Sequence, residues 1–300
     1  MIQNRFKVAD KALEKKQKQL EKTLIKEYSR ALKDIRSLLA EYYAKYEMTY
    51  AEMQKYKRLA GLEKTLIEEL RKLTKKNSRT LIKGLGDQFA ESYYRTAFIL
   101  ETEVQAKLAY TLLNPKVIEA SIMNPISGLK LNERLNKNRD LLITKIRENI
   151  TQGLIKGESY RDMAKRVKNV LEGDAAKAIR VVNTESHRAQ NDGRLKSMEH
   201  AASKGVIMKK RWIATLDDRT RDLHQELDGQ EIDIDENFTS PSGASGPAPG
   251  QLGSPEDDIN CRCTMISVIK GFEPEVRRAR GEGIIPYQNY KEWYNNRIKR

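Results

Sequence analysis

A heptad pattern in residues 25–60 is the feature that most restricts how this chain can fold. Two rows recur at every seventh position, Ile25, Leu32, Leu39, Tyr46, Met53 and Ala60 in the first and Tyr28, Ile35, Tyr42, Thr49 and Tyr56 in the second. Rows offset by three residues are the a and d positions of a helical heptad. Because tyrosine is bulky and polar for a two-stranded zipper, the pattern favours a helical hairpin or bundle, or docking onto a larger partner. An ordinary amphipathic helix in a local bundle explains the same spacing.

The chain carries an excess of positive charge. Its 300 residues include 56 Lys and Arg against 42 Asp and Glu, which gives a formal net charge of +14. This balance favours polyanionic partners such as nucleic acid, an acidic membrane surface or an acidic protein. A basic stretch within residues 1–30 supplies the candidates for contact with DNA phosphates, which are Lys11, Lys15, Lys16, Lys18 and Lys22. A solvated helix face is the alternative.

Targeting signals are not expected in this sequence. No stretch approaches the roughly 20 apolar residues that a membrane span needs. The first 20 residues lack the continuous apolar core of a secretory signal. Two cysteines in a chain of this length do not form a disulfide framework, so we expect synthesis in a reducing, intracellular compartment.

Helical patterns cover almost all of residues 1–150. Gly84 and Gly86 disfavour a continuous helix, so a break is predicted within residues 77–88. A long helix with apolar periodicity is then expected at about residues 88–113.

Further helices are expected after two Asn-Pro pairs that punctuate the chain. The first covers about residues 131–152. Ser159, with Asp162 three residues later, predicts the start of the second, and Gly173 predicts its C-terminal cap. The third covers about residues 175–203.

The composition changes after Gly205, where strand patterns replace helical ones. The segment around Trp212 predicts one strand, the run after the Asp228-Gly229 turn a second, and "INCRCTMISVI" a third. A Gly- and Pro-rich loop precedes the last strand. The fold class expected is α+β, a long, mainly helical N-terminal half followed by a small domain with a short antiparallel sheet. The regions predicted are a helical, coiled-coil-like region for partner docking at 1–150, an α+β domain at 151–270 and a C-terminal tail at 271–300.

Cys261 and Cys263 are the two cysteines of the chain and lie one residue apart. In a strand, residues i and i+2 face the same side, so both thiols would point to one place. Their Cα atoms would lie about 6.5 Å apart, near the upper limit for a disulfide, whereas two thiolates readily share a zinc ion. Two small buried residues on a sheet face are the alternative. Candidates for the remaining ligands of a metal are His224, His187, Asp217, Asp218 and Asp228.

Two polar segments carry further candidate chemistry. In "NTESHRAQNDG", Glu185 and Arg188 are spaced to pair on a helix, so this face is either a catalytic patch or an ordinary salt-bridged surface. In "LDDRTRDLHQELDG", carboxylates lie close to His224, as acid–base or metal chemistry requires. The same side chains could equally form a hydrogen-bond network that braces the Gly- and Pro-rich loop.

Taken in order, these segments resemble a known family. "NTESHRAQNDGR", "KKRWIATLDDRTRDLHQELDGQ", an acidic strand with "ENF", the Gly- and Pro-rich loop and "INCRC" are similar to the Mu F-like domain of tailed-bacteriophage minor head proteins, the head morphogenesis family. The resemblance covers about residues 175–270. "IPYQNYKEWYNNR" resembles a short segment that often follows this domain. The positions that carry the family pattern are Glu185, Trp212, Asp217, Arg219, Thr220, His224, Gly229, Asn260, Cys261, Arg262 and Cys263.

The resemblance implies a minor structural protein of the virion that associates with the portal protein and acts in head morphogenesis. Some members of the family are thought to bind DNA or to leave with it at ejection. Viral DNA and the scaffold or capsid proteins are therefore further expected partners. The expected location is inside the head near the portal, after synthesis in the cytoplasm of the bacterial host. No cofactor is expected on this interpretation.

The alternative function is a metal-dependent or nucleotide-using enzyme, a hydrolase or a transferase, carried in the virion. It would place His224, Glu185 and the cysteine pair around a metal or a nucleotide, with His224 and the two thiols as zinc ligands. On the structural interpretation, "DDINCRCTM" closes the α+β domain. Both cysteines would then lie beside His224, and Asn260 and Arg262 would fasten the loop.

Overall fold

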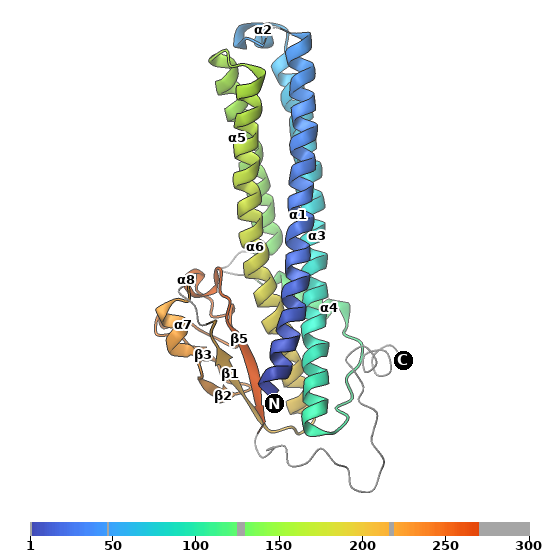
Figure 1. Ribbon diagram of the computed structural model, residues 1–300, viewed down its shortest axis with the longest axis vertical. Helices are drawn as coiled ribbons and strands as arrows, with labels where there is room; N and C mark the ends of the chain where they lie inside the picture. Colours follow the sequence, from blue (N-terminus) through green and yellow to red (C-terminus); the bar gives the residue numbers. More distant parts are fainter. Residues whose placement is uncertain (1, 47, 125–129, 216–218, 270–300) are drawn as a thin grey trace. The chain divides into compact units, whose positions relative to one another are not determined.

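The structure is a computed structural model of the 300-residue chain and describes residues 2–46, 48–124, 130–215 and 219–269. The chain forms two compact units. The helical unit consists of residues 18–83 and 129–182, and the sheet unit of residues 1–17, 84–128 and 183–300. Both units draw on the long helices α1 (Ile2–Lys45), α3 (Arg58–Val104) and α6 (Tyr160–Ser203) (Figure 1).

The helical unit is a bundle of helices around one apolar core. It contains parts of the three long helices together with α2 (Tyr50–Lys55) and α5 (Leu131–Ile155), and Figure 1 shows the long helices side by side. Leucine and isoleucine dominate the core, and Ile35 and Leu39 of α1 are completely buried in it. Apolar residues recur with the helical period, so burial of one face of each helix stabilises the bundle.

Tyrosines of α1 are accommodated because their hydroxyl groups find partners inside this bundle. Tyr28 is buried and donates to Asp174 Oδ2 at 2.6 Å, and Tyr43 donates to the Glu158 carbonyl at 2.8 Å. Burial, together with the nearby Asp174 carboxylate, raises the pKa of Tyr28 far above its ordinary value. These hydroxyl groups therefore tie α1 to α6 and to the connection between α5 and α6.

The two heptad rows do not form one continuous helical seam. α1 ends at Lys45 and α3 begins at Arg58, so α2 and its flanking residues separate the two long helices. Thr49 caps α2, and Lys57 adopts φ +53°, a left-handed conformation through which a helix does not continue. Tyr56, a member of the second row, is exposed. The residues form helices in a bundle, as the tyrosines indicated.

The helix breaks predicted at glycines are wrong. α3 passes through Gly84 and Gly86 without interruption, and α6 passes through Gly173. A Cβ atom on Gly86 would lie 3.3 Å from Ile118 Cγ2 of α4 (Pro115–Met123), so the absence of a side chain lets α4 approach closely. Packing of this kind outweighs the cost of about 1 kcal/mol that a glycine imposes on a helix.

Several other helix boundaries agree with the expectations. α5 covers Leu131–Ile155, and α6 begins directly after Ser159, whose hydroxyl accepts from the Asp162 N–H at 3.3 Å. The predicted end of the last helix at Ser203 is also correct. α3 differs, because it ends at Val104 rather than near residue 113.

The sheet unit contains a small antiparallel sheet, which confirms the α+β fold class. Its order is β2 (Glu231–Asp233), β1 (Met208–Ile213) and β5 (Thr264–Ile269). Along the central pairing, Trp212 of β1 lies opposite Met265 of β5. The remaining elements are the paired strands β3 (Phe238–Thr239) and β4 (Ser245–Gly246) and the short helices α7 (Asp222–Leu227) and α8 (Pro255–Asp258).

Two apolar clusters hold the sheet unit together. The first packs residues of α1, α3 and α6 against the sheet, and its members include Phe6, Tyr93, Met198, Met208 and Ile266. The second surrounds the completely buried Trp212 and includes Leu195, Leu227, Phe238, Cys261, Cys263 and Met265. The two cysteines are therefore part of an apolar cluster.

The expected domain boundary at residue 150 lies inside α5. Residues 151–182 belong to the helical unit, whereas residues from 183 onward belong to the sheet unit. The tail expected at 271–300 lies outside the described residues. In the part of the chain that is described, no helix is long and apolar enough to cross a membrane.

A matched pair of glycine substitutions in α6 tests the packing of the sheet unit. A Cβ atom on Gly193 would lie 2.3 Å from the Phe89 carbonyl oxygen, so Gly193→Ala forces α3 and α6 apart. We expect it to lower the free energy of unfolding by about 1–3 kcal/mol. Gly173→Ala is the control, because its Cβ atom meets nothing within 4 Å, and it should raise this free energy by about 0.5–1 kcal/mol.

Urea unfolding followed by circular dichroism measures both variants against the wild type. Equal stabilisation by the two substitutions would contradict the close approach of the two helices at Gly193.

Candidate functional site

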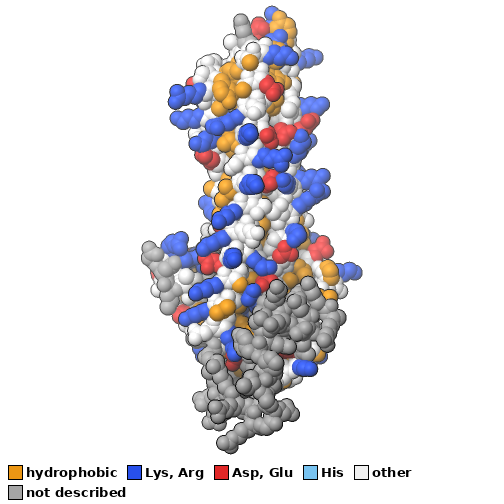
Figure 2. Space-filling view, turned by 45° about the vertical axis from the view of Figure 1, so that its right-hand side comes forward, with side chains coloured by type: hydrophobic (Ala, Val, Ile, Leu, Met, Phe, Trp, Pro, Cys, Tyr) orange, Lys and Arg blue, Asp and Glu red, His pale blue; other side chains and the backbone are white. Residues whose placement is uncertain are grey.

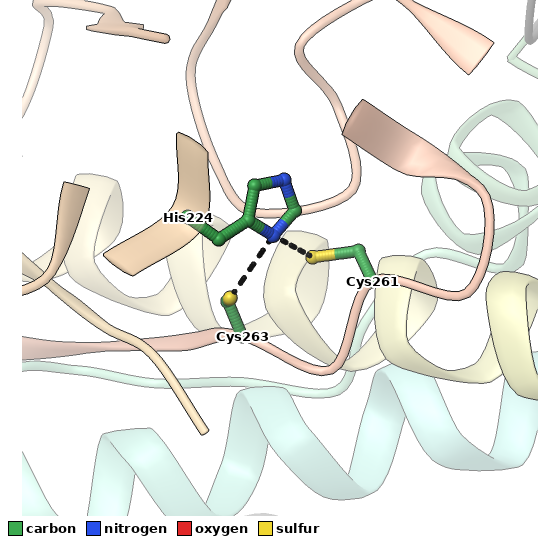
Figure 3. A group of neighbouring side chains, drawn as sticks. All are labelled: His224, Cys261 and Cys263. Carbon is green, nitrogen blue, oxygen red and sulfur yellow. Dashed lines mark hydrogen bonds between the residues drawn. The ribbon is translucent and has the colours of Figure 1, made fainter. Parts of the chain in front are cut away.

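Three side chains that can bind a metal meet inside the sheet unit (Figure 3). His224 extends from α7, and Cys261 and Cys263 come from the segment between α8 and β5. His224 Nδ1 lies 3.8 Å from Cys261 Sγ and 3.4 Å from Cys263 Sγ. Each residue is only 2% exposed. Among the described residues, no other three His, Cys, Asp or Glu side chains form such a group.

The cysteines precede the strand in which the sequence places them. β5 begins at Thr264, so the predicted strand starts too early. The reason is a turn at Asn260, which adopts φ +57°, a left-handed conformation that asparagine tolerates better than most residues. The Asn260 N–H donates to Thr184 Oγ1 of α6 at 3.0 Å. Strand geometry is therefore not needed to direct both thiols to one place.

Aromatic rings pack beside His224. The rings of Trp212 and His224 meet edge to face with centroids 5.8 Å apart, and Phe238 meets Trp212 in the same way at 5.2 Å. Trp212 and Phe238 are completely buried. The site is therefore shielded from water, which strengthens electrostatic interactions within it.

A carboxylate orients the second ring nitrogen of His224. Nε2 lies 3.5 Å from Asp257 Oδ1. The Ser240 and Ser242 hydroxyls donate to the two oxygens of Asp257 at 2.9 and 2.8 Å, and the Asp257 side chain is completely buried. Nε2 therefore faces the Asp257 carboxylate, while Nδ1 faces the two sulfur atoms.

The two thiols differ in acidity. The adjacent Cys261 thiol, with help from His224, lowers the pKa of Cys263 to about 5 although burial opposes this. The pKa of Cys261 moves well above its ordinary value because of its contact with Cys263 and its burial. Of the two thiols, Cys263 is therefore the one that loses its proton more readily. The thiolate is the form of cysteine that acts as a nucleophile or a metal ligand.

Buried polar side chains hold the Gly- and Pro-rich loop that precedes the cysteines. Asp258 accepts from the N–H groups of Leu252 and Gly253, both at 2.9 Å. Asn191 of α6 donates to the Pro249 carbonyl at 3.2 Å. These bonds satisfy backbone groups that would otherwise be buried without partners. Asn191 was not among the predicted site residues, although it lies within the quoted segment "NTESHRAQNDG".

Lys210 of β1 is a second anchor that was not predicted from the sequence. Its ammonium group donates to the carbonyls of Ile234 and Pro247 at 3.0 and 2.9 Å, and the residue is completely buried. Burial lowers the pKa of Lys210 to about 8, against the effect of nearby carboxylates such as Glu199. The sequence did contain a sign that Lys210 is buried. Residues two apart in a strand face the same side, so Lys210 lies on the same face as Trp212.

The polar face of α6 is built into the fold. Glu185 and Arg188 pair at 3.2 Å and are both nearly inaccessible to solvent. Arg188 also donates to the Asn124 carbonyl at 2.7 Å. The structure therefore contains the Glu185–Arg188 pair that the sequence spacing indicated. The Glu185 carboxylate does not belong to the group formed by His224 and the cysteines.

The remaining positions of the family pattern occupy turns and loop contacts. The Arg262 carbonyl accepts from the Thr215 hydroxyl at 2.9 Å, so this bond joins Arg262 to the residues after β1 and not to the Gly- and Pro-rich loop. The Thr220 hydroxyl donates to the Thr215 carbonyl. Gly229 adopts φ +80° in the turn after α7, and Arg219 is exposed.

The other metal-ligand candidates do not join the group. Asp217 and Asp218 lie outside the described residues. Asp228 instead accepts from the Ala214 N–H at 2.7 Å. His187 of α6 is absent from the group, and burial lowers its pKa to about 4.

The lysines predicted to contact DNA all lie on α1. Lys11, Lys15, Lys18 and Lys22 are exposed, whereas Lys16 is partly buried and pairs with Glu91 at 3.2 Å. Figure 2 shows Lys and Arg side chains spread along the visible face rather than gathered into one patch.

Known proteins resemble the chain over most of its length. The family described as "Phage Mu protein F like protein" matches residues 144–266. The minor head protein GP7 of Bacillus phage SPP1 is 39% identical over 296 residues, which cover 95% of this chain and 94% of that protein.

Two further relatives have other names. The NAD(+)–arginine ADP-ribosyltransferase EFV of Enterococcus faecalis is 34% identical over 275 residues, and the match covers 91% of this chain but only 56% of that protein. The uncharacterized protein YqbB of Bacillus subtilis is 24% identical over 268 residues, which cover 80% of this chain and 84% of YqbB. No solved structure matches the chain significantly.

The similarity to GP7 covers the helices of the N-terminal half as well as the Mu F-like region. A relationship of this extent supports a structural role in the phage head. The chain belongs to the family of phage minor head proteins with a Mu F-like domain.

Proposed function

We propose that the protein is a minor structural component of a tailed-phage head that binds the portal protein and acts in head morphogenesis. The identity of 39% to a minor head protein over nearly the whole of both chains carries this proposal. The protein is made in the cytoplasm of the host and enters the virion, where it lies inside the head near the portal. Scaffold and capsid proteins are its further contacts during assembly.

One end of the helical unit supports the contact with the portal. α2 and the connection between α5 and α6 lie together at this end (Figure 1). The tip surface, as we name it, consists of Tyr50, Tyr56, Ile155 and Tyr160, which are between 37% and 62% exposed. Tyrosine is enriched in protein interfaces, and neighbouring exposed apolar side chains mark interaction sites. We assign the tip surface to the portal contact.

Substitution of the tip surface tests this assignment. Tyr50→Ser/Tyr56→Ser/Ile155→Ser removes three exposed apolar side chains without opening the core. We expect at least a roughly tenfold loss of affinity for the purified portal protein, because central aromatic contacts carry most interface energy. Biolayer interferometry at one salt concentration measures this loss.

Val8→Ser/Leu112→Ser/Val117→Ser is the matched control, because these three exposed apolar residues belong to the sheet unit. It should bind the portal protein as the wild type does. Unchanged affinity of the tip variant would refute the assignment.

The positive charge supports a second contact, with viral DNA. The net charge is +14, and four exposed lysines recur along α1 at positions 11, 15, 18 and 22. Residues three and four apart lie on one face of a helix, so these lysines present a row of charge to a phosphate backbone. We assign this row to sequence-independent contact with packaged DNA.

Neutralisation of the row tests the DNA contact. Lys11→Gln/Lys15→Gln/Lys18→Gln/Lys22→Gln should weaken binding to duplex DNA. It should also reduce the slope of log affinity against log salt by about 0.9 for each phosphate that the variant no longer neutralises. The control carries the same charge change at other exposed lysines, Lys64→Gln/Lys75→Gln/Lys137→Gln/Lys145→Gln. Fluorescence anisotropy across a salt series measures both, and identical slopes for the two variants would show that the α1 row does not bind the DNA.

The relative named as an ADP-ribosyltransferase raises a second candidate function, a transferase. The match covers only 56% of that protein, so nearly half of it has no counterpart in this chain. We infer that the shared part is the head-protein part and that transferase activity belongs to residues outside the match. Incubation of this chain with labelled NAD+ and an arginine-containing acceptor should give no transfer of label. Transfer above a boiled-protein control would instead establish the enzyme.

A further inference from the structure

We propose that His224, Cys261 and Cys263 bind one zinc ion. The three donor atoms lie within 4.8 Å of one another, in the interior of the sheet unit (Figure 3). Two sulfur donors and one imidazole nitrogen are the ligand types that zinc takes in proteins, whereas Mg2+ and Ca2+ take oxygen donors. The residues therefore select a soft divalent ion by their chemistry.

The distances match tetrahedral coordination. With zinc–sulfur bonds of about 2.3 Å and zinc–nitrogen bonds of about 2.0–2.1 Å, the nitrogen and sulfur atoms of a tetrahedron lie about 3.6 Å apart. The distances from His224 Nδ1 to the two sulfur atoms are 3.4 and 3.8 Å, one slightly below this value and one slightly above it. An ion at the centre of the group therefore requires only small movements of the side chains.

His224 is already oriented as a metal ligand. Asp257 faces Nε2 at 3.5 Å, and Ser240 and Ser242 hold the Asp257 carboxylate in place. Metal-binding histidines commonly direct their other ring nitrogen to a carboxylate, which sets the tautomer and raises the basicity of the ligand. His224 Nε2 makes no hydrogen bond of good geometry in this structure, so Asp257 acts on the ring through its charge at 3.5 Å.

The ion would join parts of the chain that are distant in sequence. His224 lies on α7, and the cysteines follow the Gly- and Pro-rich loop, 37 and 39 residues later. The unfolded chain has no formed metal site, so the ion binds only the folded state. The free energy of metal binding therefore adds to the stability of the folded protein. The described residues supply three donors, and a water molecule would complete the tetrahedron. The primary effect of the bound ion would be to close the Gly- and Pro-rich loop.

Elemental analysis by plasma mass spectrometry tests the proposal on the full-length protein, purified without added metal. We expect about one zinc per chain in the wild type and none in Cys261→Ser/Cys263→Ser. His224→Gln should lose most of the zinc. His200→Gln is the matched control, because His200 bonds to the Leu108 carbonyl away from the group, and it should keep the zinc of the wild type.

A second measurement uses the wild type alone, so that a variant that fails to fold does not decide the result. After removal of bound metal by a chelator, the melting temperature should fall by several degrees and return on addition of zinc. Titration with Co2+ should then produce a sulfur-to-cobalt absorption band. The chain has only two cysteines, so this band reports on the proposed site.

Absence of zinc in the wild type, together with no cobalt band on titration, would overturn the proposal. Zinc that persists in Cys261→Ser/Cys263→Ser would overturn it as well, because the ion would then lie elsewhere. Neither result bears on binding to the portal or DNA, so the role in the phage head is tested separately.

Discussion

The loop that leads to the candidate metal site depends on hydrogen bonds from buried polar side chains to its backbone. The segment between β4 and α8 is rich in Gly and Pro, and Ala248, Pro249 and Leu252 are its buried apolar residues. Backbone N–H and C=O groups in such a loop need partners once they leave water. Asp258 accepts from the loop, while Asn191 and Lys210 donate to it, from a helix and a strand. These bonds therefore help to position α8 and the cysteines that follow it.

The candidate metal group follows from the same contacts. Asp258 is bonded to the loop, and its neighbour Asp257 faces His224 from the fixed end of that loop. The turn at Asn260 then brings both thiols to the same ring. Burying so many polar groups has a high energetic cost unless each is paired, so such a network favours one arrangement over its alternatives. The helical unit has a different basis, since its stability rests on apolar stripes and a few tyrosine hydroxyl bonds.

Local sequence signals predicted which helices and strands form better than they predicted the residues at which these elements begin and end. The capping residue Ser159 and the periodicity of α5 located helices correctly, because capping bonds and one-sided burial act within a few residues. The helix break predicted near Gly84 and Gly86 was wrong. The cost of about 1 kcal/mol that a glycine imposes on a helix is smaller than the gain from close packing at Gly86. The family pattern pointed to His224 and the cysteines, whereas Asp257 escaped notice as a partner of His224 because two serines on a distant turn hold it.

The sequence by itself determined the α+β class, the helical periodicity, the positive charge and the membership of the phage minor head family. These properties depend on composition, on short-range spacing and on the order of motifs. Only the tertiary structure decided that Asp257 faces the imidazole, that Lys210 is buried and that α3 passes through Gly86 against α4. The physical reason is that each of these depends on contacts between residues far apart in the chain, whose energies exceed the local preferences that a sequence pattern expresses.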